Sequence, residues 1–363
     1  MMSRWVCVPV ILASLSACTG GPEPAPATEG QPAESQAVGV TRDQMMTGAR
    51  KLVSVTADVQ PGEAVLIVTD APTRSIAEVL ADAVLERGAE PVIALIRQRG
   101  TDAAEPPASV AAAMKSSDVI YSAVSISITH TQAMKDALAA GARAIALTAF
   151  TEGMLAGGGI DGDFARIREE CKTMGERLDG AKTAHITSAA GTDLTFGVQG
   201  RRVNVMPGIV GPGQLSPVPN AEVNVSPVEG TANGTLVVDA SIPYLGIGLL
   251  KQPIRFTVRD GMITDIEGGD PAQVETLRSA WQAQADPNVF NIAEMGIGMN
   301  PMCSFKGLML EDEGVLGSIH IGTGTNITLG GVVKARSHYD LIMKAPTLTL
   351  DGEVVIQDGQ IRP

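Results

Sequence analysis

Residues 64–96 read AVLIVTDAPTRSIAEVLADAVLERGAEPVIALI, and this stretch decides the fold class. Its first six residues, AVLIVT, form a run that is apolar up to the final threonine, as expected of a strand that is buried on both faces. Apolar residues then recur at helical spacing from Ile76 to Arg87, and Gly88 stands where that helix should end. A second apolar run follows at 91–96. This strand–helix–strand order predicts a parallel sheet covered by helices.

The same alternation continues along the chain. It predicts strands at 119–124 and 144–148, and helices at 44–59 (with a connection), 108–116, 131–140 and 164–178. The first apolar run is followed by DAPTRS and not by a glycine loop, and neither a G-x-x-x-x-G-K-[ST] motif nor a G-x-S-x-G nucleophile motif occurs in the sequence. The parallel sheet is therefore predicted to be a scaffold and not a nucleotide site.

The hydrophobic pattern of the sequence changes near residue 180. Short alternating runs bounded by glycine and proline follow, with Asp-Gly turn dipeptides at 260–261 and 351–352 and one helix predicted at 272–284. We therefore predict an α/β protein with two domains. A parallel, helix-covered sheet domain occupies 41–180, and a mostly β (α+β) domain that holds a metal site occupies 181–363.

The N-terminus resembles the export signal of a bacterial lipoprotein. Arg4 precedes a short apolar run that ends in Leu15-Ser16-Ala17-Cys18, which looks like a lipobox. This predicts a signal peptide at 1–17, lipid attachment to Cys18 and a flexible linker at 18–40 rich in Pro, Glu, Ala and Gly. Since Thr19-Gly20 holds no acidic retention signal, we expect an anchor in the outer membrane of the bacterial cell envelope, facing the periplasm. An ordinary secretory signal is the alternative.

Two cysteines remain after the lipoprotein signal, Cys171 and Cys303. An exported compartment permits a disulfide between them. However, Cys171 lies in a helical pattern and Cys303 is far away in the sequence. Two separately buried thiols are the preferred interpretation.

Composition limits the partners of the protein. The formal net charge is −13 and aromatic residues make up 3% of the 363 residues, which argues against nucleic acid and anionic membrane surfaces. A small peptide or another small cationic or neutral molecule fits better, and contact with a membrane is expected only through the lipid anchor. A homo-oligomer remains possible on these grounds.

A metal site is predicted in the stretch 291–340, which contains two of the four histidines. His338 and Asp340 are two residues apart, so on a strand both side chains leave the same face. A glycine-rich turn separates them from His320, and a hairpin could bring the three together. The alternatives are a surface His–Asp pair and a core histidine. Glu294 lies in an apolar run where an unpaired carboxylate would be costly.

Further polar residues are candidates for the same site. Glu222 shares a strand face with Asn224, although it could also be a solvated strand residue, and Glu229 is a loop residue that could serve as general base. The acidic run 311–313 is interpreted as a solvated turn, and His130 and His185 as structural residues. Two histidines with three carboxylates form the donor set of a divalent site, either mononuclear or dinuclear.

Four segments resemble a known superfamily: NAEVNVSPVEGTANGTLVVD, NIAEMGIGMNP, SIHIGTG and SHYDLIMKAPTLTLDG. They are similar to the thermophilic metallo-aminopeptidases of the aminopeptidase T and aminopeptidase S (M29-type) family. That superfamily also includes the iron-dependent 2,5-dihydroxypyridine 5,6-dioxygenases. For the peptidases the resemblance implies a dinuclear centre of zinc, manganese or cobalt, and Glu229 falls near the acid–base position. The matching ligand positions here are Glu222, Glu294, His320, His338 and Asp340.

The sequence departs from the peptidase pattern at one position. Those enzymes carry a catalytic tyrosine shortly after the first metal histidine, and Ile327 stands there in this chain. The first expectation is nevertheless an aminopeptidase-like hydrolase that removes N-terminal residues from peptides. The first alternative is a ring-cleaving dioxygenase that holds one Fe2+ ion with His320, His338 and Asp340. The second alternative is a lipoprotein that kept the fold and lost catalysis.

Overall fold

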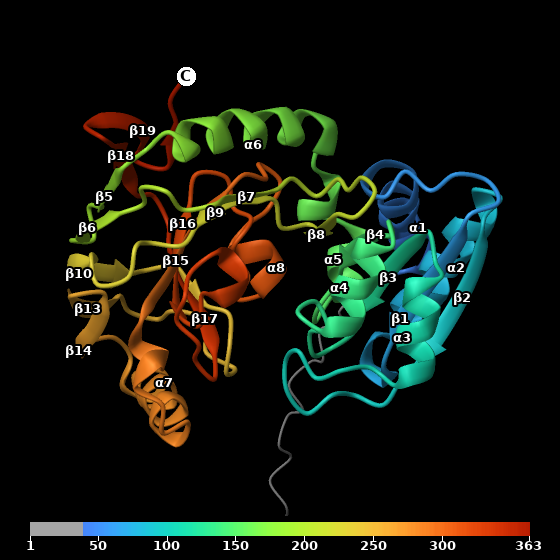
Figure 1. Ribbon diagram of the computed structural model, residues 1–363, viewed down its shortest axis with the longest axis horizontal. Coiled ribbons are helices and arrows are strands. Elements are labelled where there is room, and N and C mark those ends of the chain that lie inside the picture. Colours follow the sequence, from blue (N-terminus) through green and yellow to red (C-terminus); the bar gives the residue numbers. More distant parts are fainter. Residues whose placement is uncertain (1–38) are drawn as a thin grey trace, which may run out of the picture. The chain divides into compact units, whose positions relative to one another are not determined.

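The computed structural model describes residues 39–363 (Figure 1), and residues 40–363 form one compact unit. The predicted signal peptide (1–17), the predicted lipidation site Cys18 and almost all of the predicted linker (18–40) lie outside the described residues. The lipid anchor and the envelope location therefore stay predictions. The domain boundaries also stay predictions.

A five-stranded parallel sheet forms the first part of the fold. Its strands, in spatial order, are β2 (Glu90–Leu95), β1 (Ala64–Thr69), β3 (Val119–Ala123), β4 (Arg143–Ala146) and β8 (Leu215–Pro217). Every neighbouring pair is parallel. The predicted parallel sheet is confirmed, and its first strand has the predicted bounds. The sequence did not predict β8, a short segment that returns to this sheet from beyond residue 180.

Helices cover both faces of the parallel sheet. They are α1 (Arg42–Lys51), α2 (Arg74–Glu86), α3 (Ala108–Lys115), α4 (Gln132–Ala139) and α5 (Glu152–Ala156). Val65 and Ile67 of β1 pack on the side of α1 and α2. Leu66 and Val68, which alternate with them, pack on the side of α3 and α4. A strand that is apolar on both faces needs this double cover, which is why β1 reads as an uninterrupted apolar run.

The second part of the fold consists of two antiparallel sheets. The eight-stranded sheet has the order β14 (Met262–Gly268), β13 (Ile254–Arg259), β10 (Asn233–Val238), β6 (Asp193–Gly197), β5 (Thr183–Thr187), β18 (Thr347–Leu350), β19 (Glu353–Gln357) and β20 (Gln360–Ile361). The seven-stranded sheet has the order β12 (Gly248–Leu249), β11 (Ser241–Ile242), β17 (His338–Met343), β16 (Ile319–Gly324), β15 (Ile292–Gly298), β9 (Glu222–Val225) and β7 (Val203–Met206). The predicted change from α/β to mostly β structure is confirmed.

Turn chemistry and helix packing hold these sheets in register. Asp260 and Gly261 both have positive φ angles (47° and 78°), as the predicted Asp-Gly hairpin turn requires. Helix α6 (Phe164–Asp179) lies along β7 and β9 in Figure 1. Helix α7 (Pro271–Ala283) buries Trp281 against Phe256 and Phe290, with ring centroids 6.3 and 5.3 Å apart. The remaining short helices are α8 (Met309–Asp312), a π segment at Leu52–Thr56 and 3-10 turns at Ala71–Thr73, Gly159–Asp161, Pro287–Phe290 and Ile327–Leu329.

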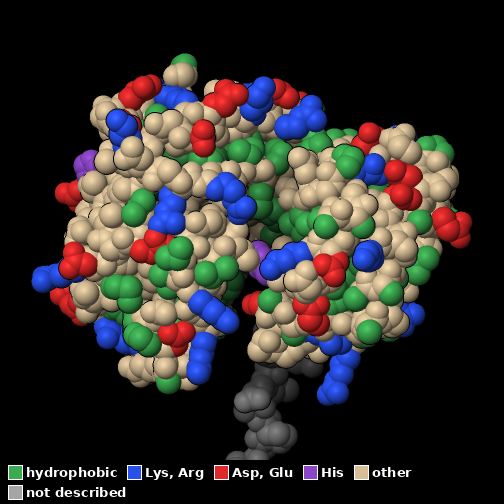
Figure 2. Space-filling view, viewed as in Figure 1, with side chains coloured by type: hydrophobic (Ala, Val, Ile, Leu, Met, Phe, Trp, Pro, Cys, Tyr) green, Lys and Arg blue, Asp and Glu red, His purple; other side chains and the backbone are tan. Residues whose placement is uncertain are grey.

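Cys171 and Cys303 are both buried and free, which confirms the preferred interpretation of two separate thiols. On the face shown in Figure 2, acidic and basic side chains are interspersed. Among residues 39–363, none of the helices combines the length and the apolar character that crossing a membrane requires.

Candidate metal centre

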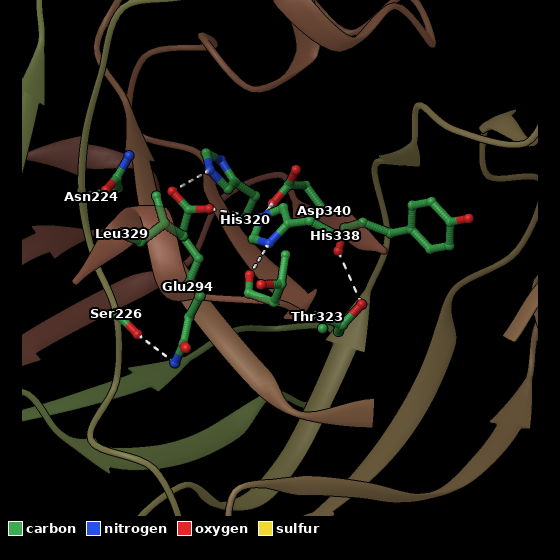
Figure 3. A network of polar contacts seen from close by, with 12 residues as sticks. Asn224, Ser226, Glu294, His320, Thr323, Leu329, His338 and Asp340 are labelled. Atoms are coloured by element: carbon green, nitrogen blue, oxygen red, sulfur yellow. Dashed lines mark hydrogen bonds and ion pairs between the residues drawn. The ribbon is translucent and has the colours of Figure 1, made fainter. Parts of the chain in front are cut away.

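Four neighbouring strands of the seven-stranded sheet carry the five residues that the sequence proposed as metal ligands. They are Glu222 on β9, Glu294 on β15, His320 on β16, and His338 and Asp340 on β17. Strands β16 and β17 pair in antiparallel fashion, so the predicted hairpin is confirmed. Figure 3 shows His320, His338 and Asp340 gathered around Glu294. The sheet therefore brings together groups that lie up to 118 positions apart in the sequence.

Glu294 lies at the centre of this cluster. Its Oε2 is 2.8 Å from Nε2 of His338, and its Oε1 is 4.0 Å from Nε2 of His320. Nε2 of His338 is also 3.3 Å from Oδ1 of Asp340, and Nε2 of His320 is 3.6 Å from Oε2 of Glu222. The ligand atoms form two groups, and within each group all atoms lie within 4.8 Å of one another. One group is Glu222, Glu294 and His320, and the other is Glu294, His338 and Asp340. His320 thus belongs with Glu222 rather than with the other two residues of the predicted iron triad.

Glycines on the strands make room for the two imidazoles. Gly296 lies opposite His320, and a Cβ atom there would overlap the His320 ring. Gly322 lies between Glu294 and Asp340 in the sheet, and its Cβ would lie 2.6 Å from Nε2 of His338. Larger residues at these positions would occupy the space of the histidine rings.

A hydrogen bond on the side away from the cluster fixes the orientation of the His338 ring. Its Nδ1 lies 2.8 Å from the backbone carbonyl of Thr325, which can only accept a hydrogen bond. Nδ1 therefore carries the proton, and Nε2 is the nitrogen that faces Glu294 and Asp340. A ring held in this way by an outer partner is the usual arrangement of a metal-binding histidine.

The cluster leaves buried polar atoms without hydrogen-bond partners. Among the described residues these include Nδ1 of His320 and Oδ1 of Asp340, and both residues are almost completely buried. A carboxylate oxygen without a partner is costly in a dry environment, and a bound cation removes that cost. Imidazole nitrogens beside carboxylate oxygens suit zinc, manganese, cobalt or iron. These residues fit a divalent metal ion.

Burial and the charges of neighbouring side chains together set the pKa values of the cluster. Burial raises the pKa of Glu222, and Glu294 adds to this effect, against the opposing influence of His320. Burial alone would lower the pKa of His338, but Asp340 and Glu294 outweigh it and raise that pKa well above its usual value. Burial would raise the pKa of Asp340, but the neighbouring His338 lowers it below its usual value. The cluster therefore combines a cationic imidazole with a carboxylate that stays ionised.

Amide side chains hold Glu222 in place. Asn220 donates to its Oε2 over 3.0 Å, and Asn224 donates to its Oε1 over 2.7 Å. The side-chain amide of Asn204 on β7 donates in turn to the side-chain oxygen Oδ1 of Asn224 over 2.7 Å. The prediction that Glu222 and Asn224 share one strand face is confirmed, and both oxygens of Glu222 are occupied by amide donors.

The interpretation of the acidic run 311–313 as a solvated turn was wrong. Glu311 and Asp312 are fully buried and Glu313 is 7% exposed. Glu311 accepts hydrogen bonds from the backbone N–H groups of Gly159 and Ser304 and pairs with Lys306. Ser304 and Lys306 belong to the loop just before α8 and Gly159 to a distant segment, and the acidic run itself does not indicate these partners.

Glu313 and Tyr244 are cluster residues that the sequence did not reveal. The hydroxyl of Tyr244 lies 2.9 Å from Oε1 of Glu313 and 2.7 Å from Oδ2 of Asp340. Burial, followed by repulsion from Asp340 and Glu222, raises the pKa of Glu313 well above its usual value. Burial, followed by the charge of Asp340, does the same for Tyr244. No local motif surrounds either residue, so only the tertiary structure places them.

Glu229 lies in a loop and takes part in a different set of contacts. It forms an ion pair with Arg201 and accepts hydrogen bonds, both over 2.9 Å, from the Asn326 side chain and the Val332 backbone. These contacts tie the loop after β16 to the segment that follows β9. The acid–base role of Glu229 stays a prediction, and in this structure its carboxylate anchors the loop after β16.

The two remaining histidines lie outside both ligand groups. His185 is exposed and pairs with Asp193 over 2.8 Å. His130 lies in the turn before α4. Among residues 39–363, neither belongs to a group of side chains close enough to share an ion.

A family model described as 2,5-dihydroxypyridine 5,6-dioxygenase matches residues 46–363. A 2,5-dihydroxypyridine 5,6-dioxygenase from Pseudomonas putida KT2440 is 27% identical over 197 residues. That alignment covers 51% of this chain and 55% of the enzyme, so the chain spans about half the length of this relative in the alignment.

Two solved structures share the fold. The 2,5-dihydroxypyridine dioxygenase from Pseudomonas putida KT2440 has a TM-score of 0.77 at 20% identity, over 89% of this chain and 98% of that one. Wild-type AmpT (aminopeptidase T) from Thermus thermophilus has a TM-score of 0.62 at 15% identity, over 89% of this chain and 100% of that one. These likenesses confirm the predicted fold class, and with the family match they confirm the predicted link to the superfamily.

Proposed function

Because this chain belongs to the family of 2,5-dihydroxypyridine 5,6-dioxygenases, we propose that it is a metal-dependent dioxygenase that opens the ring of a small hydroxylated nitrogen heterocycle. The observation that carries this proposal is the buried group of Glu294, His338 and Asp340, whose ligand atoms lie within 4.8 Å of one another. The sequence alone placed peptide hydrolysis first and ring cleavage second. The family match supports the opposite order.

The chain's own residues would hold a ferrous ion at defined atoms. His338 would bind through Nε2, since its Nδ1 is committed to Thr325. Asp340 would bind through Oδ1, since its Oδ2 is committed to Tyr244. Glu294 would add Oε2. A ferrous ion with open positions supplies electrons and the sites at which the substrate and dioxygen meet.

A second pair of residues would handle a proton. A hydroxyl group of the substrate becomes more acidic at a metal ion and needs a base within hydrogen-bond reach. Nε2 of His320 lies on the inner side of the cluster, and Oε2 of Glu222 at 3.6 Å would stabilise the imidazolium that forms. Both side chains are at most 5% exposed, so this pair can hold a proton away from bulk water.

A dinuclear hydrolase is the second candidate. The observation that favours it is the position of Glu294, whose two oxygens face different imidazoles, so that it belongs to both ligand groups and each group could hold one ion. The shared fold with AmpT is compatible with this candidate. Against it, Ile327 is 49% exposed at the position where the peptidases carry a tyrosine, and the hydroxyl of Tyr244 is engaged by two carboxylates.

Metal content and oxygen uptake distinguish these candidates. We expect the purified chain, reconstituted without oxygen, to bind one equivalent of Fe2+ and to consume oxygen together with 2,5-dihydroxypyridine or a related hydroxypyridine. His338→Ala and Asp340→Ala should each lower the rate by more than about 100-fold, because a direct ligand is lost. His185→Ala, which changes an exposed histidine outside the cluster, should behave as the wild type.

The opposite result is equally specific. Two equivalents of zinc, manganese or cobalt, with release of N-terminal residues from peptides and no oxygen uptake, would replace the dioxygenase by the hydrolase. A wild-type protein that binds no divalent metal under any of these conditions would reject both candidates.

A further inference from the structure

Tyr244 lies where a single phenol contacts two carboxylates. It belongs to the hairpin of β11 and β12, and β11 pairs with β17 at Ser241 and Ile342, two residues beyond Asp340. The hairpin thereby brings the phenol to Oδ2 of Asp340 (2.7 Å) and Oε1 of Glu313 (2.9 Å). This residue was not among those proposed from the sequence.

Hydrogen-bond counting constrains these two contacts. A phenol has one proton to donate, whereas an ionised carboxylate can only accept. The Tyr244 hydroxyl donates to Oδ2 of Asp340, the nearer of the two carboxyl oxygens at 2.7 Å, and Oε1 of Glu313 lies 2.9 Å from the same hydroxyl. The other oxygen of Asp340, Oδ1, faces Nε2 of His338 at 3.3 Å.

The two oxygens of Asp340 have different surroundings as a result. Oδ2 is held by the phenol, while Oδ1 has no hydrogen-bond partner and points to the ligand atoms of His338 and Glu294. Partners behind a ligand orient it and limit how it can bind. In an Asp340 that is tethered at Oδ2, Oδ1 is the free oxygen, and the hydrogen bond from the phenol disfavours Oδ2 as a second donor to the ion.

We infer that Tyr244 is a positioning residue that keeps Asp340 a monodentate ligand, with Glu313 as the group that orients the phenol. This inference rests on the proposed metal-dependent function and adds to it the residue that preserves an open position at the metal. Without the phenol, Oδ2 would be free to bind the ion as well and to fill the position that a substrate needs.

The packing around Tyr244 allows a conservative test. Its ring lies against that of Tyr339, with centroids 5.4 Å apart, so Tyr244→Phe removes the hydroxyl and keeps this contact. The substitution leaves Glu313 with one partner fewer in a buried position. Tyr244→Phe with Glu313→Leu replaces both polar partners and avoids an orphaned carboxyl group. Tyr339→Phe is the matched control, because that hydroxyl contacts Gln284 and none of the ligands.

The experiment is a titration of the metal-free full chain with Co2+. Its visible spectrum reports the coordination number, and competition with a chelating dye gives the Kd. We expect Tyr244→Phe and the double variant to bind Co2+ about 10–100-fold more weakly. We also expect the weaker visible absorption that a higher coordination number produces. Tyr339→Phe should match the wild type in both quantities.

The outcomes separate the inference from the proposed function. A wild type that binds Co2+ and a Tyr244→Phe protein with the same spectrum would overturn the inference and leave the proposed function standing. If Tyr244→Phe does not fold, the double variant decides by the same criterion. A folded variant that has lost Co2+ binding altogether supports the positioning of Asp340 by Tyr244. A wild type that binds no Co2+ would overturn the proposed function and this inference together.

Discussion

Gly322 lies where the ligand-bearing strands of the seven-stranded sheet meet. It is paired with Glu294 on β15 and with Asp340 on β17. A Cβ atom at this position would lie 2.6 Å from both Cε1 and Nε2 of His338 and 2.8 Å from Cβ of Glu294. Gly322→Ala therefore places a methyl group in the space that the His338 ring occupies.

The size of the effect follows from these distances. Ordinary contacts of a Cβ atom begin at 3.4 Å, so the ring of His338 must retreat by 0.8 Å. Metal–ligand distances tolerate only about 0.2 Å, so Nε2 would leave its binding position. The His338 side chain is 25% exposed and can move outward. We therefore expect a folded protein whose free energy of unfolding falls by about 1–3 kcal/mol through overpacking.

Metal-linked stabilisation measures the loss of the ligand. A divalent ion at 100 times the wild-type Kd stabilises the wild type by about 2.7 kcal/mol, and a hundredfold weaker Kd reduces this gain to about 0.4 kcal/mol. Urea unfolding with and without the metal gives both quantities. Gly197→Ala is the control, since Gly197 also lies in an antiparallel strand but its Cβ would be 3.5 Å from Oγ1 of Thr231. Full metal-linked stabilisation in Gly322→Ala would refute the reasoning.

Two further predictions concern pH and the loop held by Glu229. The pKa values of His338 and Glu313 are raised in the folded, metal-free protein, so their stabilisation is lost as pH rises through those values. As the pH is raised from about 5 to about 8, the urea midpoint of the metal-free protein should therefore decrease. Over the same range the metal-loaded protein, whose ligands must lose protons to bind the ion, should gain stability. The same pH dependence of the midpoint in both proteins would contradict this, and the lowered pKa of Asp340 affects stability only at more acidic pH. Glu229→Gln should lower the free energy of unfolding by about 1–3 kcal/mol because a charged hydrogen bond to Arg201 is lost. If the variant unfolds at the same urea midpoint as the wild type, Glu229 does not have this anchoring role.

Most of the architecture could be predicted because it depends on local patterns. The run 64–69 is apolar at every position up to its final threonine, since both faces of β1 are covered by helices, and the strand was predicted with the bounds that it has. The two-residue spacing of His338 and Asp340 predicted that their side chains leave the same face of a strand, because side chains on a strand alternate with period two. The hairpin to His320 followed from one glycine-rich turn. In each case a short stretch of sequence contains the information.

The rest of the site depends on contacts between distant segments. Tyr244 lies 96 residues from Asp340 and reaches it only because β11 pairs with β17 at the edge of the sheet. Glu313 looks like part of a solvated acidic run, since nothing in the sequence shows that Asn220 and Tyr244 will surround it. Strand β8 joins the parallel sheet with three residues, which is too short a segment to show a periodic pattern.

The surroundings of Glu222 favour one ion over two. In a dinuclear site Glu222 would be a ligand of the second ion together with His320 and Glu294. Yet both of its oxygens already accept hydrogen bonds from the amides of Asn220 and Asn224, and these donors weaken each oxygen as a ligand of a second ion. The same donors stabilise the ionised form of Glu222, which is the form that can pair with a protonated His320. A Glu222–His320 pair beside a single ion uses these donors as they stand, and this agrees with the proposed dioxygenase.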